Sequence, residues 1–327
     1  MIISKTPLRM SFVGGGSDIE SFYKRNGGAV ISTAIDKFIY INLNKKFDSG
    51  IRLAYSKVEE VENYKQVEHK LVNAALKLLK IKGGIEITSI ADIPSKGSGL
   101  GSSSSFTVGL INVLNEYLKD PISKIKLAED SCKVEIDMCK EPIGKQDQYA
   151  AAFGGFNLIE FKENGLTNVK PLICKQETIN KLEENTLMFY TGINRSASKI
   201  LLNQTKNVER SQAKQNSLIK MVDLAYSLYK DLSDDNLSSF GEILNINWEL
   251  KKSLNKDISN DFIDECYKAA TMEGALGGKI LGAGAGGFLM IYAPKEKHDQ
   301  IKIKLNNLRN IPVKFYKSGS KIIYNNG

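Results

Sequence analysis

The chain has 327 residues, of which 42% are hydrophobic and 25% charged, proportions that exclude a collagen-like or disordered protein. Its net charge of +8 comes from 45 basic and 37 acidic residues dispersed along the chain, which favours small anionic ligands over a nucleic acid. No apolar run approaches the roughly 18 residues of a membrane helix. Lys5 and Arg9 lie where a signal peptide would have its apolar run, so we expect a cytoplasmic protein with no membrane partner.

Four cysteines and two histidines narrow the chemistry that the chain can perform. No two cysteines have CxxC spacing, so we expect reduced thiols rather than a disulfide framework or a zinc site at Cys132, Cys139, Cys174 and Cys266. His69 and His298 both lie in charged, helix-like segments. Because histidine, the usual general base, is scarce, we expect a carboxylate to serve in that role.

The first half of the chain is predicted to be mainly strands before residue 100 and mainly helices after it. Short segments rich in Ile, Val, Tyr and Phe predict strands at 8–13, 28–35, 38–43, 51–55 and 85–90, with a helix at about 66–80. Helical patterns follow at about 103–118, 123–140 and 145–153, and a strand at 155–161.

The second half is predicted to begin near residue 185 with a strand at 186–190. Helices are expected at about 196–230, 236–254, 259–274 and 295–307. Two strands flank a glycine-rich loop at 282–287, and two more close the chain at 312–316 and 320–324. Neither half alternates strand and helix strictly, so the pattern favours two α+β lobes, at 1–184 and 185–327, over a doubly wound sheet.

A glycine- and serine-rich segment at residues 93–105 is the strongest motif. It reads IPSKGSGLGSSSS, follows a predicted strand and opens a predicted helix. Glycines let the backbone approach a ligand closely, serines are expected to cap the helix, and the helix N-terminus favours a phosphate. It is not a Walker A loop, because no Gly-Lys-Ser/Thr follows. A flexible Gly/Ser linker is the alternative interpretation.

Two acidic residues occupy unusual positions. Glu135 falls on the apolar arc of the predicted helix at 123–140, where a carboxylate is costly unless it is paired or binds a metal. A buried salt bridge and a place at the rim are the alternatives. Asp147 lies in the polar turn EPIGKQDQY at a predicted helix start, where it has either a catalytic role or only a favourable interaction with the helix dipole.

Two further glycine clusters stand at opposite ends of the chain. GGGSD at 14–18 follows the first strand, and GAGAGG lies at 282–287. Each alone is weak evidence, since a tight turn or a bulge would explain it. Three such clusters, together with the isolated Arg9 and the two acids, are less easily explained as turns or bulges alone.

In combination these motifs resemble those of the GHMP-superfamily kinases, named for galactokinase, homoserine kinase, mevalonate kinase and phosphomevalonate kinase. The matching segments are, in chain order, PLRMSFVGGGSD, IPSKGSGLGSSSS and KILGAGAGGF. The middle segment is specific to the superfamily. The first is closer to the sugar 1-kinase branch than to galactokinase, and GKQDQYAAAFGGFN and FYTGINRSASKIL resemble the heptose 7-phosphate kinases most closely.

The resemblance implies a role for each motif. The second loop would wrap the ATP phosphates with Gly97, Ser98, Gly99, Leu100, Gly101, Ser102, Ser103 and Ser104. Ser103 and Glu135 would hold Mg²⁺. Asp147 would take the proton from the acceptor hydroxyl, and Arg9 would lie near Asp147 and offset charge on the transferring phosphoryl group. The acceptor would be bound by Gly15, Gly16, Ser17, Asp18, Arg195, Gly284 and Gly286.

The implied fold is two α+β lobes with ATP and a small sugar or sugar phosphate in the cleft between them. The implied activity is ATP-dependent phosphorylation of the anomeric hydroxyl of D-glycero-D-manno-heptose 7-phosphate to the 1,7-bisphosphate, for nucleotide-activated heptose synthesis. Arg195 would bind the 7-phosphate, with an ordinary surface arginine as the alternative. A fucokinase-like kinase of an unphosphorylated sugar and a non-catalytic relative are the other functions considered, and the oligomeric state is left open.

Overall fold

The computed structural model describes residues 1–93, 97–193 and 197–326, and within them a large sheet organises the first half of the chain. Its main path runs β12-β1-β2-β5-β3-β4, and β6 and β7 extend it beside β2. The strands are β1 (Ile2–Val13), β2 (Gly28–Lys45), β3 (Ile51–Ala54), β4 (Val58–Val61), β5 (Ile85–Ala91), β6 (Phe156–Phe161), β7 (Thr167–Pro171) and β12 (Lys321–Asn325). The long β2 pairs with β6 through its first part and with β5 through its second.

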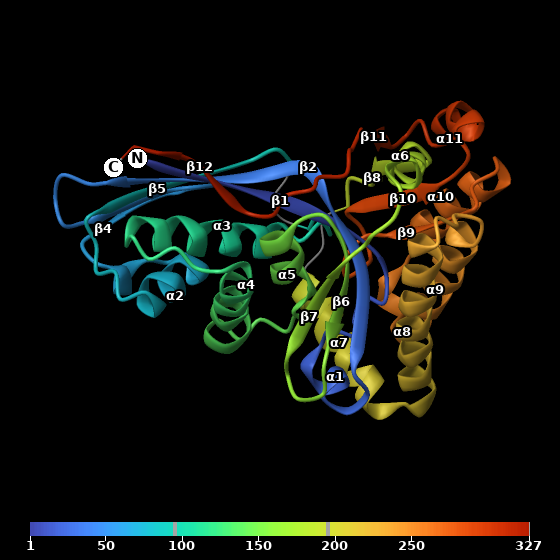
Figure 1. The fold of residues 1–327 in the computed structure, drawn as a ribbon, viewed down its shortest axis with the longest axis horizontal. Coiled ribbons are helices and arrows are strands. Elements are labelled where there is room, and N and C mark those ends of the chain that lie inside the picture. Colours follow the sequence, from blue (N-terminus) through green and yellow to red (C-terminus); the bar gives the residue numbers. More distant parts are fainter. Residues whose placement is uncertain (94–96, 194–196, 327) are drawn as a thin grey trace.

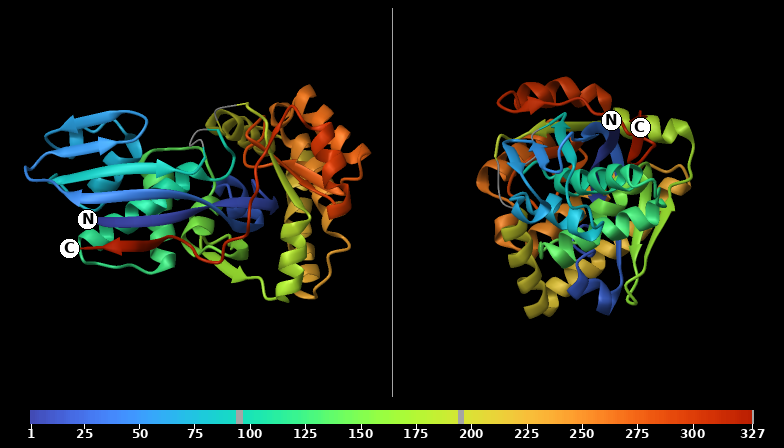
Figure 2. Two further views of the ribbon diagram at one scale, coloured as in Figure 1. Left: turned by 90° about the horizontal axis from the view of Figure 1, so that it is seen from above. Right: turned by 90° about the vertical axis from the view of Figure 1, so that its left-hand side faces the viewer.

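Helices cover one face of this sheet, as Figure 1 shows from the side and Figure 2 from above. They are α2 (Lys70–Leu78), α3 (Ser102–Tyr117), α4 (Lys124–Cys132) and α5 (Gln146–Phe153). The helix α3 lies directly on β1, where the Ser4 hydroxyl donates to the Gly109 carbonyl at 2.9 Å. A Cβ on Gly109 would lie only 2.7 Å from Thr6 Oγ1, so this close approach requires glycine.

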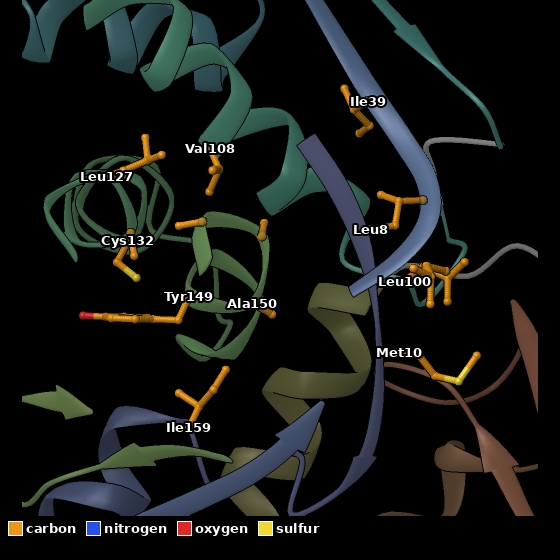
Figure 3. Close-up of a cluster of buried hydrophobic side chains, with 14 of the residues drawn as sticks. Leu8, Met10, Ile39, Leu100, Val108, Leu127, Cys132, Tyr149, Ala150 and Ile159 are labelled. Carbon is orange, nitrogen blue, oxygen red and sulfur yellow. The ribbon is translucent and has the colours of Figure 1, made fainter. Parts of the chain in front are cut away.

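The apolar core fills the space between the sheet and these helices. Figure 3 shows side chains of β1, β2, β6 and the helices gathered there. Its labelled members are all buried: Leu8, Met10, Ile39, Leu100, Val108, Leu127, Cys132, Tyr149, Ala150 and Ile159. Burial of this apolar surface is the main force that holds the sheet and the helices together, and it fixes the two loops that follow β1 and β5.

A second, four-stranded sheet organises the other half in the order β11-β8-β10-β9. Its strands are β8 (Thr186–Tyr190), β9 (Gly277–Ile280), β10 (Phe288–Tyr292) and β11 (Arg309–Asn310). The helices of this half are α6 (Gln176–Glu184), α7 (Ala197–Arg210), α8 (Gln212–Ser233), α9 (Phe240–Leu254), α10 (Asp261–Met272) and α11 (His298–Lys304). A separate apolar cluster around the fully buried Trp248 stabilises it.

The chain ends beside its own first strand. After the second sheet it returns to the first, and β12 pairs antiparallel with β1, so the termini lie side by side (Figure 1). The predicted two-lobed α+β arrangement is therefore confirmed, whereas the boundary between residues 184 and 185 stays a prediction. None of the described helices combines the length and the apolar character needed to cross a bilayer.

Several predicted elements need correction. The strands expected at 28–35 and 38–43 are one strand, because Asp36 and Lys37 form a bulge against β1 rather than a break. The helix expected at 196–230 is interrupted at Ser211, whose hydroxyl accepts from the Lys214 N–H and caps α8. The strand expected at 312–316 is a single bridge from Phe315 to Ile35.

Five further strands and α-helices escaped prediction: α1 (Glu20–Asn26), β4, β7, α6 and the two-residue β11. The strands β4 and β7 lie at sheet edges and present mostly exposed or half-exposed residues, so they lack an alternating apolar pattern. The helix α6 buries only Thr178 and Leu182, too few for a clear helical stripe. The helix expected at 123–140 also changes character, since α4 ends at Cys132 and a π-helical turn, η2 (Lys133–Met138), continues it.

Candidate active site

A cleft of about 190 Å³ lies where loops of the first sheet meet the second half of the chain. It is lined by the loop after β1, the glycine loop before α3, the turn before α5, the start of α7, and residues of α9 and β9. Twelve residues singled out from the sequence line it: Arg9, Gly15, Gly16, Asp18, Gly97, Ser98, Gly99, Gly101, Ser102, Ser103, Ser104 and Asp147. Motifs more than a hundred residues apart in the sequence therefore share one cavity.

An arginine–aspartate pair occupies the centre of the cleft. Arg9 Nε donates to Asp147 Oδ1 at 2.7 Å and Nη2 donates to Oδ2 at 2.9 Å, which is a two-pronged contact. Arg9 lies on β1 and is 3% exposed, while Asp147 is in the first turn of α5. Arg9 Nη1 also donates to the Gly99 carbonyl at 2.6 Å. The guanidinium thus joins the acid to the glycine loop and fixes both.

The glycine loop leads directly into α3. Gly101, at φ +74°, is the residue before the helix, and no side chain of the described residues caps the helix start, so the expected serine cap is wrong. Ser98 and Ser102 instead share a hydrogen bond of 2.7 Å across the loop. A Cβ on Gly99 would lie 2.2 Å from the Leu281 carbonyl oxygen, so this loop touches the third glycine motif. An uncapped helix start facing a cavity is suited to a phosphate.

Glu135 is buried, as its place on the apolar arc suggested. It is 0% exposed and lies in the π-helical turn η2, a local widening often found at functional sites. Ser103 Oγ donates to Glu135 Oε1 at 2.9 Å, and Gln148 Nε2 donates to Oε2 at 2.5 Å. Burial raises the pKa of Glu135 to about 7. No cationic side chain among the described residues forms an ion pair with it.

The arrangement at Glu135 fits a magnesium ion. A buried carboxylate and a neighbouring hydroxyl lie close to the N-terminus of α3, which is suited to a phosphate. They offer the oxygen ligands that Mg²⁺ prefers when phosphate oxygens supply its other ligands. The described residues contain no cluster of three acidic, histidine or cysteine side chains that would hold a metal without such phosphates.

Asp18 forms the other wall of the cleft. Its Oδ1 accepts from the Gly16 N–H at 2.9 Å and from Gln146 Nε2 at 3.1 Å, and its Oδ2 accepts from the Gln146 N–H at 3.1 Å. Burial raises the pKa of Asp18, and the neighbouring Asp147 raises it further. Ser11 Oγ and Gln146 Oε1 lie beside it, buried and without a hydrogen-bond partner among the described residues. Such unpaired polar atoms around a cavity suit a polyhydroxylated ligand.

Some predicted site residues lie elsewhere. Ser17 points inward and bonds to the Gly14 and Ala29 carbonyls, so it supports the loop rather than the cavity. Leu100 is fully buried in the core. Gly284 and Gly286 pack against other backbone, while Gly282 and Ala283 of the same motif line the cleft. Arg195 lies outside the described residues.

The sequence reasoning missed two buried lysines in the cleft, Lys251 of α9 and Lys279 of β9. It also missed a larger cavity of about 680 Å³ that shares Ser102 and Ser103 with the cleft. Three rings of that cavity lie together, because His69 packs 4.8 Å from Tyr55 and 5.0 Å from Phe106. His69 also directly precedes α2 and lies between Glu68 and Lys70, in agreement with the expected charged, helix-like surroundings. A signal for Lys279 was its position as the first residue of the third motif, KILGAGAGGF.

Comparisons with known proteins agree with this geometry. The family models for the GHMP kinase N-terminal and C-terminal domains match residues 69–155 and 228–309. The chain is 32% identical to the D-glycero-alpha-D-manno-heptose 7-phosphate kinase of Campylobacter jejuni, over 92% of each protein. The chain belongs to the GHMP kinases. It is therefore an ATP-dependent sugar kinase, and it binds ATP and a sugar or sugar phosphate.

Two further comparisons show how the GHMP kinase relates to other sugar kinases. A crystal structure of a D-glycero-D-manno-heptose 1-phosphate kinase from Bacteroides thetaiotaomicron superposes with a TM-score of 0.82 at 26% identity, covering 100% of both chains. The bifunctional fucokinase/GDP-fucose pyrophosphorylase of Arabidopsis thaliana is 26% identical over 95% of this chain and 32% of that protein. The chain thus spans about a third of the fucokinase relative and the whole of the heptose kinase.

Proposed function

We propose that this GHMP kinase transfers the γ-phosphoryl group of ATP to the anomeric hydroxyl of D-glycero-D-manno-heptose 7-phosphate, giving the 1,7-bisphosphate. The observation that carries the proposal is the two-pronged Arg9–Asp147 pair, which stands in the cleft between the glycine loop and Asp18. It sets a carboxylate and a fixed cation between a site suited to phosphate and a site suited to hydroxyl groups.

Asp147 is the base in this proposal. Its carboxylate lines the cleft and accepts hydrogen bonds only from Arg9 among the described residues, so it has further lone pairs for an acceptor hydroxyl. Arg9 holds the carboxylate in one orientation and stands close to the glycine loop, where charge develops on the transferring group. Asp18, with Ser11 and Gln146, orients the other sugar hydroxyls.

In this proposal, ATP binds on the side of Asp147 opposite to Asp18 and the sugar. The α3 start and the loop Gly97–Gly101 bind the phosphates, and the 680 Å³ cavity beside Ser102 holds the nucleoside against Tyr55, His69 and Phe106. Ser103 and Glu135 would hold Mg²⁺. When bound, the ion neutralises charge on the β- and γ-phosphates. Catalysis by the chain's own residues then consists of positioning and electrostatic stabilisation.

The 7-phosphate acceptor is supported by the 32% identity to a heptose 7-phosphate kinase over nearly the full length of both chains. A kinase of an unphosphorylated sugar is the second candidate, and the fucokinase relative at 26% identity favours it. All the proposed catalytic residues are compatible with either acceptor, since both acceptors offer an anomeric hydroxyl. A non-catalytic relative is disfavoured, because Arg9, Ser103, Glu135 and Asp147 are all present and in contact in pairs.

A panel of acceptors tests the proposal. Purified protein is incubated with ATP, Mg²⁺ and a series of sugars and sugar 7-phosphates, and phosphorus NMR follows the new anomeric phosphate. We expect kcat/KM to be highest for D-glycero-D-manno-heptose 7-phosphate. A preference for fucose or another free hexose would replace this proposal with the fucokinase-like one, and the absence of any phosphorylated product would contradict both.

A further inference from the structure

Two buried lysines of the cleft have no part in the function proposed above. Lys251 of α9 is 4% exposed and Lys279 of β9 is 3% exposed, and both line the cleft with Arg9 and Asp147. Lys251 Nζ donates to the Gly15 carbonyl at 3.0 Å and to Gln204 Oε1 at 2.9 Å. Lys279 Nζ donates to the Ser11 and Phe12 carbonyls at 3.1 and 3.2 Å.

These ammonium groups lack the partner that a buried cation normally has. No carboxylate of the described residues lies within 4 Å of either one, in contrast to Arg9. Each ammonium has three N–H groups, and the described residues accept two of them. A buried charge without a counterion is costly, so its presence at a cavity favours an anionic ligand.

An unpaired amide beside Lys251 supports this interpretation independently. Gln204 of α7 is 0% exposed, and its Nε2 has no hydrogen-bond partner in the described part of the chain. A Cβ on Gly16 would lie 2.5 Å from Gln204 Nε2 and 3.2 Å from Lys251 Nζ, so both donors crowd against a glycine of the cleft wall. An amide N–H without a partner, next to an ammonium group with one N–H left over, is suited to the oxygens of an anion.

We propose that Lys251 and Lys279 form a buried two-lysine site that binds a phosphate group in the cleft, with Gln204 as an additional donor. The phosphate has two sources under this proposal, the group in transfer from ATP and the phosphate that the acceptor already carries. Burial lowers the pKa of Lys251 to about 8, and burial together with the charges of Lys251 and Arg9 lowers the pKa of Lys279 to about 7. A bound dianion would therefore favour the protonated form of both.

The test compares Lys251→Met and Lys279→Met, which keep the apolar stem and remove the charge, with a matched variant of the same region. Asn247 lies one turn before Lys251 on α9, is 0% exposed, and bonds to the Gly14 N–H and the Phe12 carbonyl. It ties the same loop to α9 without a charge and does not line the cleft. Asn247→Ala therefore measures the effect of loosening the loop alone.

Binding of inorganic phosphate, followed by calorimetry, is the direct measurement. We expect each lysine variant to bind phosphate at least tenfold more weakly than Asn247→Ala does. Equal phosphate affinity in all three variants, or no phosphate binding by the wild-type protein, would show that the lysines only tether the loop. Circular dichroism confirms folding, and Lys251→Gln serves where a methionine variant does not fold.

Steady-state kinetics then identify the source of the phosphate. A tenfold lower kcat with both phosphorylated and free sugars indicates the transferring group. A tenfold higher KM for the sugar 7-phosphate, with no change for the free sugar, indicates the acceptor's own phosphate. The second arm rests on the proposed function. If no sugar 7-phosphate is a substrate, that function fails, while phosphate binding and the first arm still decide whether the lysine site exists.

Discussion

The two sides of the cleft carry positive charge in different ways. On the side of the first sheet, Arg9 is bound to Asp147 by two short hydrogen bonds and to the Gly99 carbonyl by a third. On the side of the second sheet, Lys251 and Lys279 contact only carbonyls and an amide oxygen, with no carboxylate of the described residues in range. The positive charge of Arg9 is therefore neutralised by a carboxylate of the protein, whereas no described carboxylate pairs with the two lysines.

This difference separates two functions that a kinase cleft requires. A paired arginine costs little to keep in place without substrate and holds the proposed base, Asp147, at a fixed distance from the glycine loop, which is preorganisation. Unpaired lysines gain a counterion only when an anion binds, so we expect them to contribute to binding rather than to geometry. The predictions below test each side in turn.

The largest effect is expected on the paired side. Asp147→Asn removes the negative charge and the proton acceptor, yet keeps the size of the side chain beside Arg9. General base catalysis contributes about 10²–10⁴-fold, so kcat should fall by that factor while nucleotide still binds. Single-turnover kinetics and ATP titration measure the two quantities.

Asp137→Asn is the matched control, because Asp137 is an exposed acid in η2 that does not line the cleft. It should leave kcat unchanged. Turnover of Asp147→Asn near that of the control would remove Asp147 from the role of base, and the Arg9 pair would then be structural only.

The next effect concerns the acid beside the glycine loop. Glu135→Gln and Ser103→Ala should each raise the Mg²⁺ concentration for half-maximal activity by about 10–100-fold, because each removes one of two contacting oxygen donors. Activity is titrated with Mg²⁺ at fixed ATP. Ser105→Ala is the control, since Ser105 lies on the same helix but donates to the Pro7 carbonyl at 2.8 Å. An unchanged requirement in both site variants would make Glu135 a structural acid.

Much of the paired side could be predicted from the sequence. Arg9 and Asp147 are 138 positions apart, and only the resemblance of their segments to family motifs brought them together. The helical period placed the charged Glu135 on an apolar arc, which left burial and a place at the rim both open, and the structure shows that it is buried. Its exact neighbours did not follow, since the π-helical turn η2 changes the direction of the side chain relative to a regular helix.

The unpaired side could not be found in the same way. Lys251 and Lys252 are adjacent in a chain rich in lysine, yet the first is 4% exposed and the second forms ion pairs with Glu249 and Asp264. The helical period was a usable signal, because Lys251 shares the arc of the buried Leu244 and Trp248 on α9. Gln204 offered the same kind of signal, because it lies one turn from the buried Ile200 and Val208 on α7.

A pH dependence is the third prediction, and it separates the two sides. Lys279 and Lys251, with pKa values lowered to about 7 and about 8, lose their protons as the pH rises. The charged groups that face them are Arg9, Asp18 and Asp147. Affinity for inorganic phosphate should therefore fall up to about tenfold between pH 7.5 and 9, where most of the inorganic phosphate is already the dianion.

The measurement is calorimetry at several pH values on the wild-type protein and on Lys251→Met. The variant should show a shallower dependence, because one of the two titrating groups is gone. An affinity that is constant across this range would show that the lysines stay protonated or do not contact the phosphate. An identical slope in the variant would exclude Lys251 specifically.

The smallest effect tests how closely the paired side is fitted together. Gly101 and Gly165 both have left-handed backbones, at φ +74° and +89°, so an alanine at either position should cost about 1–2 kcal/mol of stability. A Cβ on Gly165 would meet nothing within 4 Å, whereas one on Gly101 would lie 3.3 Å from both Arg9 Cγ and Asp147 Cγ. Gly101→Ala should therefore also lower kcat by a few fold, since even a displacement well below 1 Å disturbs a positioned base.

Thermal unfolding and kcat are measured on both variants. Equal loss of stability with lower kcat only in Gly101→Ala supports a fitted pair, and equal kcat in the two would mean that Arg9 and Asp147 have room to move.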